Sequence, residues 1–182
     1  MKQIETDLPG VVLLEPSVME DARGLFFESY NQRDFAKFGI LDPFVQDNHS
    51  KSKKDTLRGL HYQINHPQAK LCRVIVGEVL DVVVDLRQSS PFRGRHLKTV
   101  LSAANRRQIY IPPGFAHGFL VLSETAEFLY KCSDFYVRED ERGVRWSDPA
   151  FGIEWGVERP LLSEKDSRLP LLAEIPQIDL PE

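Results

Sequence analysis

The chain has 182 residues, enough for one domain with a sizeable core and too few to count on a second. Its residues are 42% hydrophobic and 27% charged, a composition that argues against a disordered, collagen-like or disulfide-stapled protein. The 23 basic and 27 acidic residues leave a net charge of -4, which argues against a dominant nucleic-acid surface but leaves room for a local basic pocket that binds phosphate.

The N-terminal segment has no apolar stretch after a basic start, so we expect no secretory signal. No window approaches the ~20 apolar residues that a membrane helix needs. The only cysteines, Cys72 and Cys132, are typical of small core residues in a reducing compartment rather than of a disulfide framework. We therefore expect a cytoplasmic protein with no membrane partner.

The N-terminal region predicts two short apolar segments and a short helix. Residues 10–16 and 24–30 are apolar runs bounded by turn residues. Asn31 is a suitable N-cap for a helix over residues 32–37, and Gly39 is a suitable residue to end it.

A dense β series follows. Residues 48–55 are polar and basic, and this composition predicts a surface loop. Apolar stretches separated by Gly and Pro then predict strands over residues 57–63, 70–76, 79–86, 97–102, 108–111, 114–122 and 127–136. Short strands at this spacing, punctuated by 12 prolines and 11 glycines, predict a mainly β sandwich or barrel.

The character of the sequence changes after Trp146. Asp148 followed by Pro149 resembles an N-cap with Pro at the first helical position, which predicts a short helical turn. Residues 163–166 predict another turn, which Pro170 would soon end. We expect these residues to pack as an arm on the β core, so that residues 1–182 form one domain.

Arg58 and His61 are the first residues that could carry chemistry. A lone histidine in an apolar strand is more often a core residue with one satisfied hydrogen bond. Strand alternation places Arg58 and His61 on opposite faces. If both serve one pocket, Gly59 marks a bulge or twist that re-aims one of them.

The spacing Pro-x-Gly-x-x-His over residues 112–117 resembles the second motif of the cupin superfamily, whose members are small jelly-roll barrels. In metal-binding cupins this histidine, here His117, is a ligand. The first cupin motif supplies His-x-His, but this chain has His61-Tyr62-Gln63, and Lys70 just downstream would repel a dication. The metal site is therefore incomplete by ligand count. A metal-dependent cupin that uses His61 and His117 stays open as an alternative.

Taken together, segments along almost the whole chain, from about Leu8 to Leu172, closely resemble the dTDP-4-dehydrorhamnose 3,5-epimerase family. They are residues 26–30, 45–50, 57–63, 77–79 with Asp81 and Asp85, 111–119, 127–131 and 162–166. The resemblance implies a cupin-type jelly roll with a few short helices, no metal and no cofactor. It also implies epimerisation at C3 and C5 of a 4-keto-6-deoxy sugar carried by thymidine diphosphate, on the route to dTDP-L-rhamnose.

Such an epimerase needs a base on one face of the sugar, a proton donor on the other, and a cation at the C4 oxygen, because removing either hydrogen next to the ketone gives an enolate. The resemblance implies that His61 is the base and that Asp166 is the carboxylate paired with it. It further implies that Tyr130 is the proton donor and Lys70 the cation. From the residues alone, the preferred role of Asp166 is in a capping box with Ser163, and only the resemblance favours the dyad.

Tyr130 and Lys70 also have ordinary structural alternatives, as an aromatic core residue and a solvated lysine at a strand end. The turn-like residues 65–68 favour the site, because they suggest that strands 57–63 and 70–76 pair antiparallel and bring Lys70 close to His61.

The family resemblance also implies a set of substrate contacts: Arg23, Glu28, Gln46, Asp47, Asn48, Arg58, Lys70, His117, Glu141 and Lys165. Arg23 and Arg58 match diphosphate contacts, for which guanidinium groups are well suited. Arg23 would come from the partner subunit of a homodimer with exchanged N-terminal strands. One departure from the family pattern is Cys132, which stands where a threonine or alanine is usual.

Three alternatives to a 3,5-epimerase remain at this point. A single-site epimerase would act at C3 or C5 only and could use the same residues. A metal-dependent cupin enzyme would use two histidines as ligands. A non-catalytic module would bind a sugar nucleotide without exchanging its protons.

Overall fold

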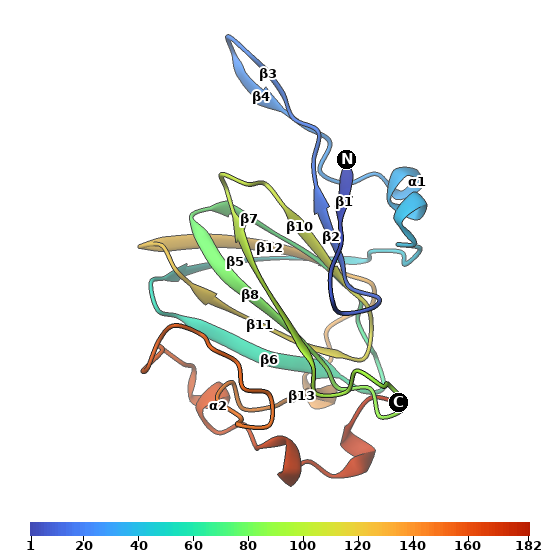
Figure 1. The fold of residues 1–182 in the computed structure, drawn as a ribbon, viewed down its shortest axis with the longest axis vertical. Helices are drawn as coiled ribbons and strands as arrows, with labels where there is room; N and C mark the ends of the chain where they lie inside the picture. The colour runs from blue at the N-terminus through green and yellow to red at the C-terminus, as the bar shows by residue number, and fades with distance from the viewer.

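The computed structural model of residues 1–182 is built from two antiparallel sheets that face each other across a common interior (Figure 1). In order across the sheet, the six-stranded one comprises β1 (Lys2–Ile4), β2 (Val12–Glu15), β10 (Gln108–Ile111), β7 (Lys70–Val76), β12 (Thr125–Cys132) and β5 (Gln46–Lys53). The five-stranded sheet comprises β13 (Glu141–Gly143), β6 (Leu57–Gln63), β11 (Phe115–Val121), β8 (Glu78–Asp85) and β9 (His96–Ser102). This arrangement is the predicted mainly β jelly roll of cupin type.

Apolar side chains from the facing sheets fill one end of the interior. Val74 and Phe128 of the six-stranded sheet pack with Val83 and Phe119 of the five-stranded sheet. The rings of Phe119 and Phe128 stack with their centroids 4.2 Å apart. Burial of such side chains is the main favourable term in folding, so this cluster holds the sheets together, and Phe119 and Phe128 also form part of the wall of the cavity described below.

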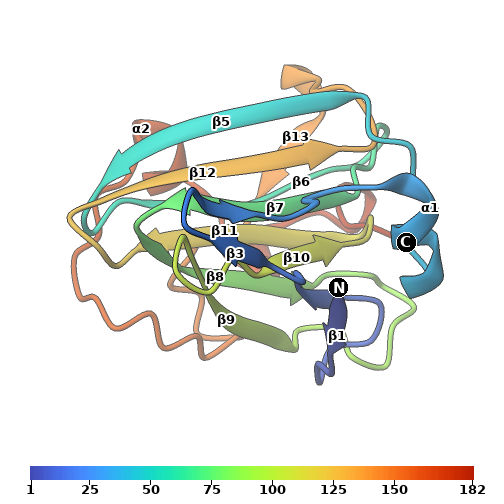
Figure 2. The same cartoon turned by 90° about the horizontal axis from the view of Figure 1, so that it is seen from above.

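The predicted strands are confirmed, with boundaries shifted by a few residues. The predicted loop over residues 48–55 is wrong, because Gln46–Lys53 forms β5 at the edge of the six-stranded sheet (Figure 2). Polar side chains occupy both faces of this strand, since one face lines the cavity described below and the other faces outward. A strand with two polar faces lacks the alternation of apolar residues on which strand prediction depends.

The predicted antiparallel pairing of residues 57–63 with 70–76 is also wrong. Strand β6 pairs with β11 and β13, whereas β7 pairs with β10 and β12 in the other sheet. The chain between them crosses from one sheet to the other, and the Asp140 carboxylate holds this crossing by accepting hydrogen bonds from the backbone N–H groups of Asn65 and His66. His61 and Lys70 therefore approach the interior from opposite sheets.

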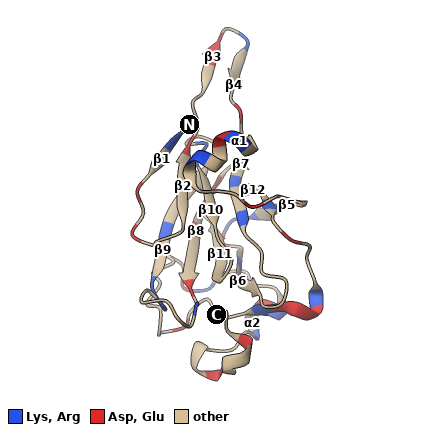
Figure 3. Ribbon diagram, turned by 90° about the vertical axis from the view of Figure 1, so that its right-hand side faces the viewer, with Lys and Arg blue, Asp and Glu red and all other residues tan.

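The predicted N-terminal helix is present in short form. Helix α1 (Gln32–Phe35) continues as a 3₁₀ turn over Ala36–Phe38, the Asn31 side chain accepts from the backbone N–H of Arg33, and Gly39 ends the turn with φ of +79°. The preceding hairpin of β3 (Met19–Asp21) and β4 (Gly24–Phe26) projects away from both sheets (Figures 1 and 3).

The C-terminal residues pack as the predicted arm on the five-stranded sheet. Trp155 of this region is buried in one apolar cluster with Leu60 and Tyr62 of β6. The predicted helical turn after Asp148 is only a turn, in which Asp148 Oδ1 accepts from the backbone N–H of Ala150. Helix α2 (Glu164–Ser167) forms as predicted. No helix in the structure is long and apolar enough to cross a membrane.

Candidate active site

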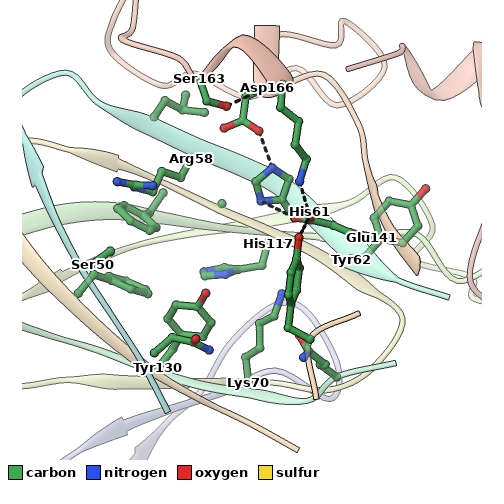
Figure 4. A pocket seen from close by; sticks show the side chains of 18 of the residues that line it. Ser50, Arg58, His61, Tyr62, Lys70, His117, Tyr130, Glu141, Ser163 and Asp166 are labelled. Carbon is green, nitrogen blue, oxygen red and sulfur yellow. Dashed lines mark hydrogen bonds and ion pairs between the residues drawn. The ribbon is translucent and has the colours of Figure 1, made fainter. Parts of the chain in front are cut away.

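A cavity of about 690 Å³ opens between the two sheets and the C-terminal arm (Figure 4). It brings together residues that the sequence places far apart. Of the predicted site residues, the lining includes Gln46, Asn48, Arg58, His61, Lys70, His117, Tyr130, Glu141, Lys165 and Asp166. A concave site with several titratable groups is the kind of place where binding and catalysis occur.

His61 and Asp166 are in direct contact on one wall of this cavity. His61 Nε2 lies 2.6 Å from Asp166 Oδ1, and the Asp166 side chain is only 5% exposed. Burial alone would raise the pKa of Asp166, but hydrogen bonds from His61 and Ser163 lower it below the usual value for aspartate. The carboxylate is therefore ionised and only accepts, which assigns the proton to Nε2 and leaves Nδ1 as the unprotonated ring nitrogen of neutral His61.

The alternative interpretation of Asp166 as a helix cap is also correct. Its backbone N–H donates to Ser163 Oγ at 3.0 Å at the start of α2. The cap involves the main chain of Asp166 and the dyad involves its side chain, so the two roles are compatible. Capping by Ser163 fixes the first turn of α2 and aims the Asp166 carboxylate at His61.

The predicted bulge at Gly59 is confirmed. Strand β11 pairs His117 with His61 and Phe119 with Arg58, and the register shifts between these pairs. Gly59 has φ of +118°, and a Cβ there would lie 2.5 Å from the Gly118 Cα, so both conformation and space require glycine. The shift puts Arg58 on the same side of β6 as His61, where its Nε donates to Ser52 Oγ at 3.1 Å.

Glu141 forms a second acidic contact beside His61. Its Oε1 lies 3.7 Å from His61 Nδ1, its Oε2 accepts from the Tyr136 hydroxyl at 2.7 Å, and Lys165 forms an ion pair with it. Burial would raise the pKa of Glu141, but its contacts with Lys165, Tyr136 and His61 lower it. His61 thus lies between two carboxylates, one at each ring nitrogen.

The opposite wall carries Tyr130 and Lys70, on neighbouring strands of the six-stranded sheet. Register pairs Tyr130 with Cys72 and Cys132 with Lys70, so the two side chains are diagonal neighbours on the inner face. Burial raises the pKa of Tyr130 to about 12. Its hydroxyl makes no hydrogen bond within the chain, and Lys70 makes no ion pair. Both polar ends are therefore free to contact a ligand.

The family assignment rests on the whole chain. Residues 5–174 match the family model described as dTDP-4-dehydrorhamnose 3,5-epimerase. The chain belongs to this family. Relatives of the same name from Shigella flexneri and Pseudomonas aeruginosa are 55% and 56% identical over 168 residues, which cover 91% of this chain and 93% of each relative.

Solved structures of family members are also similar. The dTDP-6-deoxy-D-glucose-3,5-epimerase of Legionella pneumophila, in complex with dTDP-4-keto-L-rhamnose, has a TM-score of 0.97 and 45% identity, covering 100% of this chain and 97% of that one. A 3'-monoepimerase from Streptomyces bikiniensis, in complex with dTDP-quinovose, has a TM-score of 0.90 and 33% identity, covering 97% of this chain and 91% of that one. Epimerases with different described outcomes therefore share this fold.

Three predicted contacts of this family member lie outside the cavity. Arg23 is on the projecting hairpin, where its side chain is 91% exposed and pairs with Asp21. Glu28 is exposed and accepts from the Asn31 side chain. Asp47 points away from the cavity, because alternation along β5 turns its neighbours inward, and it pairs with Lys131 at 2.8 Å. Within one chain, these residues do not meet the others.

The candidate site also contains residues that the sequence did not indicate. Tyr136 is the last residue of a predicted strand, but it lines the cavity and its hydroxyl donates to Glu141. Asp81 is fully buried, and its Oδ2 lies 2.9 Å from Nε2 of His117. Ser50 lies in the segment predicted as a surface loop, but it lines the cavity. Nothing in the local sequence distinguishes Tyr136. For Asp81, in contrast, alternation along an apolar strand predicts an acidic side chain that points into the core.

The cupin-type histidines are each engaged by a carboxylate. His61 contacts Asp166 and His117 contacts Asp81. No group of three or more His, Cys, Asp or Glu side chains is arranged to hold a metal ion.

Proposed function

We propose that this chain converts dTDP-4-dehydro-6-deoxy-D-glucose into dTDP-4-dehydro-L-rhamnose by inverting C3 and C5. One observation carries the proposal: a histidine–aspartate pair and an unpartnered tyrosine hydroxyl line the same cavity from opposite sheets, with a free lysine beside the tyrosine. The relative from Legionella pneumophila, described in complex with dTDP-4-keto-L-rhamnose, supports the choice of sugar nucleotide.

The base in this proposal is His61. Its Nδ1 takes the proton from C3 or C5, and the electron pair of the broken C–H bond moves toward the C4 carbonyl to give an enolate. The imidazolium that forms donates to Asp166 through Nε2–H and faces the Glu141 carboxylate on its other side. These contacts stabilise the charge that His61 gains, while Lys165 offsets the charge of Glu141.

The proton donor is Tyr130 and the cation at the C4 oxygen is Lys70. A pKa of about 12 keeps the Tyr130 phenol protonated at neutral pH, so it can deliver a proton to the face of the carbon opposite His61. The Lys70 ammonium stabilises the enolate oxygen. Removal of a proton from one face of the carbon and addition of a proton to the other face invert its configuration. Exchange of both groups with solvent then resets the site and leaves a solvent hydrogen in the product.

The nucleotide end of the substrate would lie toward Arg58, with Arg23 supplied by the partner of a homodimer. The position of Arg23 supports this division, because the hairpin carries it away from the cavity of its own chain (Figure 3). The same hairpin exposes Met19 and Phe26, at 62% and 66%, and a partner would cover these apolar side chains. We also place the protein in the cytoplasm, a proposal that its free, buried cysteines support.

Turnover in deuterium oxide tests the proposal. A 3,5-epimerase introduces deuterium at both C3 and C5 of the sugar, which mass spectrometry and proton NMR detect. Label at one carbon only would establish a single-site epimerase, the second candidate, which the similarity to a 3'-monoepimerase favours. Tight binding of dTDP without any exchange would refute both and support a non-catalytic module.

A further inference from the structure

Ser50 carries a polar atom that nothing in the chain satisfies. Its Oγ is buried and has no hydrogen-bond partner, a property that only Asp81 Oδ1 shares among the side chains of this protein. Ser50 lies on the inner face of β5 and lines the cavity (Figure 4). An unpaired buried hydroxyl destabilises the free protein, so its presence on a cavity wall points to a partner that arrives with a ligand.

The neighbours of Ser50 on the same face of β5 are already paired. The Asn48 side chain accepts from Gln46 and donates to Cys132 Sγ. Ser52 Oγ accepts from Arg58 Nε. The stripe of polar side chains along β5 is therefore satisfied on both sides of Ser50 and not at Ser50 itself.

Strand register places Ser50 along the length of the cavity. Asn48 lies opposite Tyr130, and Ser50 lies opposite Phe128, one inward position further along β5. The next inward position is Ser52, which holds Arg58. Ser50 is thus located between the proposed proton donor and the proposed diphosphate contact, as Figure 4 also shows.

The carbon atoms of the hexose match the order of Tyr130, Ser50 and Arg58 along the cavity. In the proposed binding mode, the reacting carbons C3, C4 and C5 lie near Tyr130, and C1 carries the diphosphate toward Arg58. C2 lies between C1 and C3, and in a 6-deoxy hexose it carries a hydroxyl. We infer that Ser50 binds the C2 hydroxyl of the substrate and makes the enzyme prefer 2-hydroxy over 2-deoxy sugars. This inference rests on the proposed function.

The test compares dTDP-4-keto-6-deoxyglucose with its 2-deoxy counterpart, in the wild-type enzyme and in Ser50→Ala. One hydrogen bond predicts that the wild type prefers the 2-hydroxy sugar by about threefold to tenfold in kcat/KM. In Ser50→Ala the ratio should fall to about one. The thermal midpoint of the free variant should be unchanged or higher, because alanine removes the unpaired hydroxyl. Ser50→Cys, close to serine in shape and a weak donor, should be intermediate.

Ser52→Ala is the matched control, one inward position away. It releases Arg58, so it should slow both sugars alike and keep the wild-type ratio. A wild-type ratio in Ser50→Ala would overturn the inference, as would equal losses for both sugars with weaker dTDP binding, which would assign the hydroxyl to the diphosphate. If wild-type enzyme exchanges no proton of either sugar, it is the proposed function that fails.

Discussion

Replacement of Asp166 by asparagine tests the dyad most directly. The amide keeps the size of the carboxylate and a hydrogen-bond partner for His61 at the 2.6 Å contact, but it removes the charge and can donate as well as accept. The tautomer of His61 with the proton on Nε2 is then no longer favoured. The imidazolium also loses its nearest counter-charge. Positioned general acid–base groups contribute about 10²- to 10⁴-fold, so we expect Asp166→Asn to lower kcat by about that factor.

The assay is release of the C3 and C5 hydrogens under saturating substrate, together with the affinity for dTDP. Affinity should change little, because Asp166 contacts His61 rather than a proposed phosphate-binding group. Ser163→Ala is the matched control, since it removes the cap of α2 and keeps the carboxylate. Ser163→Ala should lower the free energy of unfolding by about 0.5–2 kcal/mol. Its loss of kcat should be much smaller than that of Asp166→Asn. If Asp166→Asn kept kcat within threefold of wild type, Asp166 would be a cap residue only.

The dependence of stability on pH gives a second readout of the same contact. The pKa of Asp166 is lower in the folded protein than in the unfolded chain, so the ionised form stabilises the fold. This contribution is fully present above the ordinary aspartate pKa of about 3.9 and is lost as the pH falls through the lower, folded value. Wild type and Asp166→Asn should therefore differ most in unfolding free energy at neutral pH and converge in acid. A difference in unfolding free energy that did not change with pH would contradict an ionised Asp166 in contact with His61.

Other substitutions separate the remaining roles. Tyr130→Phe should lower epimerisation by about 10²-fold or more while substrate still loses its hydrogen to solvent, and equal losses of both rates would refute a donor role. Lys70→Met should lower kcat by about 10²- to 10³-fold with dTDP affinity kept, and a loss confined to KM would argue against enolate stabilisation. Gly59→Ala should lower the unfolding free energy by more than about 2 kcal/mol, because the added Cβ meets Gly118 at 2.5 Å. Gly94→Ala, also at positive φ but with open space, should cost less, as denaturant titration would show.

The strands that the sequence predicts correctly share one physical property. Their inner faces are buried against the other sheet, so alternation or an apolar run marks them, as in β8, where the residues from Val82 to Asp85 are all buried. Strand β5 has no such face, because its inner residues line a polar cavity. The crossing between β6 and β7 was equally hidden, because the carboxylate that holds it belongs to Asp140, which is 75 residues from Asn65 in the chain.

The candidate site was predictable only in part for a similar reason. The bulge at Gly59 follows from local logic, since Arg58 and His61 share a pocket only if the register shifts. The pairing of His61 with Asp166 spans 105 residues, and no local pattern encodes it. The capping pattern at Ser163 even favoured a different role for Asp166. Only the family resemblance predicted the pair, and the structure shows that the two side chains are in contact.

The two sheets explain why this fold suits inversion at carbon. The facing sheets do not close completely on each other but leave a cavity of about 690 Å³, within the usual size range of small-molecule sites. In the proposed reaction a base on one sheet and an acid on the other contact opposite faces of a sugar ring, with His61 on β6 and Tyr130 on β12 in these roles. The arrangement of the sheets thus accounts for the proposed stereochemistry. The side chains that position the ring determine how many carbons are inverted. A 3'-monoepimerase with the same fold fits that division.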